Sequence, residues 1–116
     1  IEKLKIIVEN SSNCILYPDY LIETEVKNII QGFRRGEIEE FRTSQELVFA
    51  YVRVLIREGY LKLDEVGFYH NDYFFDKQDS YHENLIEFKV DKNGGTYFDD
   101  MFNEFQNFYS RLIWLL

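Results

Sequence analysis

Apolar positions in this chain are spaced like a strand at its start and like helices further on. Residues Leu4–Val8 form a nearly continuous apolar run that ends in Glu9 and Asn10. Such a run is typical of a strand buried on both faces in the middle of an α/β sheet. After Pro18, apolar residues recur every three or four positions, which predicts a helix with one stripe on the sheet. The stripe consists of Ile22, Val26, Ile29, Ile30 and Phe33.

Glycines and a capping pattern bound the predicted helices. Gly32 and Gly36 are expected to end the first helix. Thr43 and Glu46 match a capping box, in which Thr43 caps a second helix and Glu46 reaches back to it. Gly59 is expected to end that second helix. Its expected core face carries Leu47, Tyr51, Val54 and Leu55.

The remaining segments favour short strands and a last helix. Residues 37–41 are predicted to form a weak edge strand, and residues 65–70 and 84–91 two further strands. Thr96 is expected to cap the last helix, whose wide apolar stripe indicates core packing rather than a cofactor site. That stripe comprises Phe98, Met101, Phe102, Phe105, Phe108, Tyr109, Leu112 and Ile113.

These elements predict one α/β domain over residues 1–116, with helices packed on a small mixed sheet. Residues 1–60 hold the first strand and both early helices, and residues 61–116 hold a strand hairpin and the last helix. A chain of 116 residues with 46% hydrophobic content is long and apolar enough to bury a core.

Charge and cysteine content narrow the function classes. The formal net charge of −8 disfavours direct binding of nucleic acid, whose phosphates would be repelled. Cys14 is the single cysteine, so no internal disulfide can form and a reducing, cytoplasmic compartment is expected. No apolar run reaches the roughly 18 residues needed to span a bilayer, so no membrane association is expected.

Residues 69–83 carry imidazole and carboxylate groups that admit two interpretations. They include His70, Asp72, Asp76, Asp79, His82 and Glu83. Such groups can bind a metal, but no tight ligand spacing such as His-Glu-x-x-His occurs. A solvated, aromatic-rich loop between strands is therefore the favoured interpretation. Cys14 has no histidine at motif spacing, so a structural thiol is favoured over a nucleophile.

Several blocks, in a fixed order, carry a resemblance to a known family. The first strand ends in Glu9-Asn10, residues 15–18 read Ile-Leu-Tyr-Pro, and residues 41–48 read Phe-Arg-Thr-Ser-Gln-Glu-Leu-Val. They resemble the Walker B strand, a His-Leu-His-Pro helix start and a Glu-Thr-His-Ser-Glu strand end. These motifs occur in AAA/ABC-type P-loop ATPases related to SMC proteins, which include predicted ATPases of bacterial defence systems and overcoming-lysogenisation-defect enzymes. The tail of such ATPases is similar to residues 55–61, 64–69 and 86–94.

The resemblance implies the carboxyl-terminal half of such an ATPase in degenerate form. Glu9 would hold Mg²⁺, directly or through water, while Asn10 replaces the acid that orients the attacking water. Thr43 stands at the switch histidine, followed by Ser44. No Gly-x-x-x-x-Gly-Lys-Ser/Thr motif occurs, so Mg-ATP is expected only if an upstream P-loop half exists.

The function expected from this resemblance is structural or regulatory, completing a nucleotide-binding head. It places the first strand in the centre of the sheet, with Glu9 near Thr43. A protein partner or a homodimer is expected, using the first strand or the apolar residues 112–116. The alternative is a small acidic protein-binding chain of the immunity or inhibitor type, based on the net charge and on residues 69–83.

Overall fold

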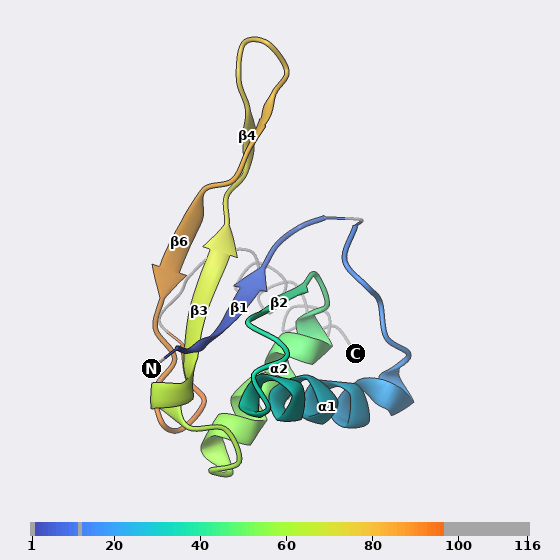
Figure 1. The fold of residues 1–116 in the computed structure, drawn as a ribbon, viewed down its shortest axis with the longest axis vertical. Helices are drawn as coiled ribbons and strands as arrows, with labels where there is room; N and C mark the ends of the chain where they lie inside the picture. Colours follow the sequence, from blue (N-terminus) through green and yellow to red (C-terminus); the bar gives the residue numbers. More distant parts are fainter. Residues whose placement is uncertain (1, 12, 97–116) are drawn as a thin grey trace, which may run out of the picture.

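The computed structural model describes residues 2–11 and 13–96. Along this part of the chain, strands and helices alternate before a run of short strands (Figure 1). The strands are β1 (Leu4–Val8), β2 (Glu40–Thr43), β3 (Val66–Asn71), β4 (Phe74–Phe75), β5 (Tyr81–His82) and β6 (Leu85–Phe88). The helices are α1 (Ile22–Arg34) and α2 (Glu46–Arg57), and short 3-10 turns η1 (Asp19–Leu21) and η2 (Leu63–Glu65) precede α1 and β3.

A mixed four-stranded sheet in the order β2-β1-β3-β6 organises the fold. β1 runs parallel to both β2 and β3, and β6 pairs with β3 in the antiparallel sense. The predicted α/β class and the central position of the first strand are therefore confirmed. Since β1 is paired on both sides, neither of its edges is free to receive a strand from another chain.

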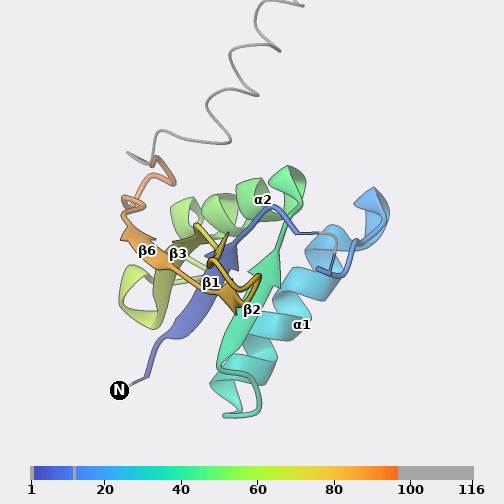
Figure 2. The same ribbon diagram turned by 90° about the horizontal axis from the view of Figure 1, so that it is seen from above.

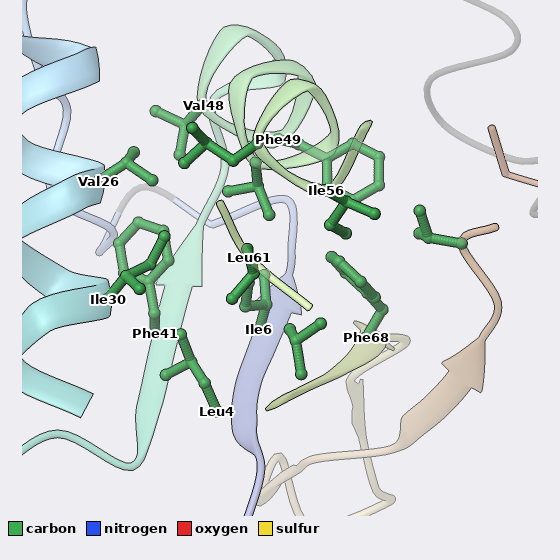
Figure 3. Packing of buried hydrophobic residues seen from close by; sticks show 14 of the residues in the cluster. Leu4, Ile6, Val26, Ile30, Phe41, Val48, Phe49, Ile56, Leu61 and Phe68 are labelled. Carbon is green, nitrogen blue, oxygen red and sulfur yellow. The ribbon is translucent and has the colours of Figure 1, made fainter. Parts of the chain in front are cut away.

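Both helices pack on one face of this sheet (Figure 2). Alternate strand residues point to that face, and Figure 3 shows how Ile6, Phe41 and Phe68 meet Val26, Ile30, Phe49 and Ile56 from the helices. Phe49 makes edge-to-face contacts with Phe68 and Phe88, with ring centroids 6.0 and 5.8 Å apart. Burial of these large aromatic and aliphatic groups is the main stabilising term of the domain.

The same terminal motif ends both helices. Gly36 and Gly59 have φ near +80°, a conformation that side chains with a Cβ rarely adopt. Backbone bonds from Glu37 N–H to the Gly32 carbonyl and from Tyr60 N–H to the Leu55 carbonyl close the two ends. The predicted stop at Gly59 is confirmed, as is the stop at Gly36.

Three local predictions about the helices are wrong. Gly32 lies inside α1, where a Cβ would come within 2.6 Å of Ile38 Cδ1, so close packing accounts for this glycine. Thr43 ends β2 and does not cap α2, which begins at Glu46 after Gln45. On α2, Leu47 is 51% exposed and Val54 also faces solvent. The helix is apolar almost all round, so periodicity alone could not identify its buried stripe: Val48, Phe49, Val52, Leu55 and Ile56.

The predicted strands occur with shifted bounds. The weak edge strand of residues 37–41 is β2, which starts at Glu40 and does lie at the sheet edge. Residues 65–70 and 84–91 correspond to β3 and to the shorter β6. Residues 69–83, interpreted as a solvated loop, instead contain the end of β3 and the β4–β5 hairpin, which projects from the sheet (Figure 1). The predicted last helix and residues 112–116 lie outside the described residues.

Candidate functional site

The carboxyl ends of β1 and β2 lie side by side, as the parallel pairing requires. Val8 pairs with Thr43, and Glu9 N–H donates to the Thr43 carbonyl at 3.0 Å. Glu9 therefore lies close to the start of α2, which confirms the predicted neighbourhood of Glu9 and Thr43. Chemistry in open α/β folds is usually placed at this end of the sheet.

The Glu9 carboxylate is buried and already has partners. Glu9 is 6% exposed, and its Oε2 accepts a hydrogen bond from Asn71 Nδ2 at 2.7 Å. Arg42 forms an ion pair with the same oxygen at 3.3 Å. The Cys14 thiol donates to Oε1 at 3.4 Å. A buried carboxylate requires such donors, because an unpaired charge in a desolvated position is strongly disfavoured.

Arg42 connects the open face of the sheet to the hairpin. Its guanidinium pairs with Glu9, with Glu40 at 2.8 Å and with Glu83 at the end of the hairpin. The hydrogen bond with Glu83 is the main cause that raises the pKa of Arg42 above its ordinary value. Three carboxylates around one guanidinium leave this cluster with a formal charge of −2.

Asn71 joins Glu9 to the hairpin from the other side. Its side-chain amide, 2% exposed, donates both to Glu9 and to the Tyr81 hydroxyl at 3.0 Å. Asn84 N–H donates to Asn71 Oδ1 at 3.3 Å, and Tyr73 donates from its hydroxyl to the Asn10 carbonyl at 3.2 Å. The polar network of Glu9, Arg42 and Asn71 thus fixes the base of the hairpin against the loop that follows β1.

Cys14 is a half-buried free thiol beside this network. Burial raises the pKa of the Cys14 thiol, and the hydrogen bond to the Glu9 carboxylate adds to the rise. A raised pKa favours the protonated thiol, which is a weaker nucleophile than the thiolate. This environment fits the structural thiol favoured from the sequence.

The remaining predicted site residues arrange the loops around Glu9. Thr43 Oγ1 accepts from Gln45 N–H at 3.0 Å, so the hydroxyl shapes the turn into α2. Gln45 in turn binds both backbone groups of Tyr17, at 2.7 and 2.9 Å. Asn10 contributes its carbonyl to Tyr73, and Ser44 lies half-buried between Thr43 and Gln45.

A cleft of about 550 Å³ opens between the hairpin and the loop after β1. Glu9 and Arg42 are its charged lining residues. Its walls come from the loop and from three aromatic rings of the hairpin. The lining residues are Glu9, Asn10, Ser11, Asn13, Arg42, Tyr73, Phe75 and Tyr81. Of the predicted site residues, Glu9 and Asn10 line this cleft.

The acidic and imidazole groups of residues 69–83 do not gather around one point. His82 Nε2 pairs with Asp76 Oδ2 at 2.7 Å, and this hydrogen bond is the main cause that lowers the pKa of Asp76. Within residues 2–11 and 13–96, no three His, Cys, Asp or Glu side chains are placed to hold a metal ion. Glu9 as a metal ligand remains a prediction from the resemblance, and its Oε2 already accepts hydrogen bonds from Arg42 and Asn71.

Sequence reasoning did not identify Arg42 and Asn71, the two residues that define the surroundings of Glu9. Arg42 is two positions past Glu40 on the same strand face, and Asn71 ends β3 next to the end of β1. Polar residues at the ends of neighbouring parallel strands are the signal that could have pointed to them.

Comparison with protein-family models, with curated proteins and with solved structures finds no match to this chain. Among the described residues, no helix is both long and apolar enough to cross a bilayer. The resemblance to SMC/ABC-like ATPases therefore has only the residues and their arrangement to support it.

Proposed function

We propose that this chain is the carboxyl-terminal part of a degenerate SMC/ABC-like ATPase head with a structural or regulatory role. The observation that carries the proposal is the hydrogen bond between Glu9 and Thr43 at the ends of parallel strands. The family resemblance requires its Walker B strand and its switch strand to meet in this way. In this proposal the Glu9 carboxylate has become an anchor for Arg42 and Asn71.

The surroundings of Glu9 support a non-catalytic role. An Mg²⁺ ion gives up its water ligands reluctantly, so a carboxylate that binds it must be accessible to the hydrated ion. Glu9 is buried, and its Oε2 already accepts a hydrogen bond from Asn71. Asn10 cannot accept a proton from an attacking water, and the Thr43 hydroxyl is engaged with Gln45. The six glycines of the chain are not arranged as a phosphate-binding loop.

The coding sequence upstream of Ile1 tests the assignment to an ATPase head. A Gly-x-x-x-x-Gly-Lys-Ser/Thr motif in the same reading frame is the expected result. A short complete reading frame without that motif would contradict it. Calorimetry with Mg-ATP tests whether the chain alone binds the nucleotide. We expect no micromolar affinity, which would require about 8 kcal/mol of binding free energy. Phosphate release that disappears in Glu9→Ala would contradict this part of the proposal.

The second candidate is a small acidic protein-binding chain. One observation favours it: the β4–β5 hairpin exposes several aromatic side chains to solvent. They are Tyr73, Phe74, Phe75 and Tyr81. Clustered exposed aromatic residues are typical of protein interaction sites.

A further inference from the structure

The three aromatic rings of the cleft form one connected wall. Tyr73 contacts Phe75 nearly at right angles with centroids 6.3 Å apart, and Tyr81 lies 5.6 Å from Tyr73 and 5.8 Å from Phe75. Phe75 is 59% exposed although it lies beside the cleft. A ligand that covered these rings would gain binding free energy from the burial of their apolar surface.

Hydrogen bonds hold this wall in place. The Tyr81 hydroxyl accepts from Asn71, the Tyr73 hydroxyl donates to Asn10, and Asp72 N–H donates to the Asn84 carbonyl at the hairpin base. The rings are therefore presented by a preorganised arm. Preorganisation lowers the entropy cost of binding.

The charged groups around the cleft indicate the charge that a ligand should carry. Arg42 and Glu9 line the cleft, and Arg42 also pairs with Glu40 and Glu83, so these four groups together carry a formal charge of −2. The whole chain carries −8. The faces of aromatic rings attract cations through their quadrupole, so the aromatic wall and the net negative charge around Arg42 both favour a cationic ligand.

We propose that this cleft binds an arginine side chain of a partner protein. A guanidinium is planar, stacks on aromatic faces and carries five donors. Asn10, Ser11 and Asn13 also line the cleft, and their side chains carry oxygens that can accept hydrogen bonds from a guanidinium. A compact ammonium would satisfy fewer of these acceptors and is more strongly hydrated. The inference does not depend on the ATPase-like assignment, and it gives the protein-binding candidate a specific chemistry.

An NMR titration of the full chain with capped arginine, N-acetyl-arginine N-methylamide, tests the proposal. We expect saturable shifts of the Tyr73, Phe75 and Tyr81 ring signals, with a dissociation constant on the order of 1 mM for this minimal ligand. Capped citrulline has the same shape without the charge and is expected to bind roughly tenfold more weakly. Equal binding of the two ligands, or shifts that do not involve these rings, would overturn the proposal.

The hairpin offers a matched pair of variants. Phe75 lines the cleft, whereas the adjacent Phe74 points to the opposite face of the hairpin, where its ring stacks on His82 at 5.0 Å. Both are at least half exposed, so Phe75→Leu and Phe74→Leu should both fold. We expect roughly fivefold weaker binding of capped arginine to Phe75→Leu and unchanged binding to Phe74→Leu. Equal effects of the two substitutions would count against the cleft.

Free arginine separates two sources of the guanidinium. It carries its own carboxylate and ammonium, which a side chain within a protein lacks. We expect free arginine to bind no more tightly than capped arginine, because its carboxylate meets the acidic surroundings of Glu9 and Glu83. Tighter binding of free arginine would assign the cleft to a small metabolite and would overturn the proposed protein partner.

Discussion

The two faces of β1 differ in how they are stabilised. Leu4, Ile6 and Val8 point to the helices and pack in a continuous apolar core. Ile7 and Glu9 point the other way, to a face that no helix covers within the described residues. Ile7 is nevertheless buried, because it lies in register between Arg42 and Tyr69 on the neighbouring strands.

This difference shows that one strand can serve two purposes. The covered face is stabilised by non-directional burial of apolar area, which tolerates changes of partner. The open face relies on directional bonds around one carboxylate, so each partner matters individually. The hairpin and its cleft depend on the second kind of interaction, since Asn71 and Arg42 connect them to Glu9.

The largest expected effect comes from the covered face. Leu55→Ala should lower the free energy of unfolding by about 2–5 kcal/mol, because Leu55 is 1% exposed and its loss leaves a cavity. Leu47→Ala on the same helix is the matched control and should change stability by about 0.5 kcal/mol or less. Urea denaturation measures both. Similar losses for the two variants would mean that the buried stripe of α2 is misassigned.

On the open face, Asn71→Ala should cost about 1–3 kcal/mol, because it leaves the buried Glu9 carboxylate without its shortest hydrogen bond. Asn28 on α1 is exposed and provides the control, since Asn28→Ala deletes the same amide group at a position where it is solvated. Denaturation curves give the stability, and the Tyr81 ring signal should also shift because its hydroxyl loses its donor. An unchanged stability for Asn71→Ala would remove the argument for a directional network.

The smallest effect concerns acid. Arg34 holds Glu65 through two hydrogen bonds of 3.1 Å, which lowers the pKa of Glu65 below its ordinary value near 4.5. A lowered folded-state pKa stabilises the protein above pH 4.5, and this contribution is lost as the pH falls through the folded value. Glu65→Gln should therefore lower stability at pH 7 by about 0.5–1 kcal/mol and have no effect near pH 2. Thermal unfolding at the two pH values measures the difference.

The packing of the helix-covered face of β1 was predictable from sequence, whereas the polar contacts of its open face were predictable only in part. The run Leu4–Val8 predicted a central strand, and the family resemblance predicted that Glu9 lies near Thr43. The partners of Glu9 could not be predicted in the same way. Arg42 and Asn71 are 33 and 62 positions away from Glu9, so only the strand register brings them together.

The hairpin shows a second limit of sequence reasoning. Residues 74–75 and 81–82 are too few to produce a strand pattern, and their pairing depends on a hydrogen-bonded turn between Asp76 and Ser80. Composition therefore indicated an aromatic-rich loop where the chain forms an arm. The same composition was the basis for the alternative prediction of a protein-binding chain, and three of its aromatic rings line the cleft.

The hydrogen bonds of the buried Glu9 carboxylate to Asn71 and Arg42 assign it a structural role. The most direct measurement is the unfolding free energy of wild type and Glu9→Gln, each with and without millimolar Mg²⁺. We predict that Glu9→Gln is less stable by about 1–3 kcal/mol and that Mg²⁺ stabilises neither protein. Removal of a carboxylate kept for metal binding typically leaves stability unchanged or raises it. A neutral or stabilising Glu9→Gln substitution, together with Mg²⁺ stabilisation of the wild type alone, would show instead that Glu9 is a metal ligand.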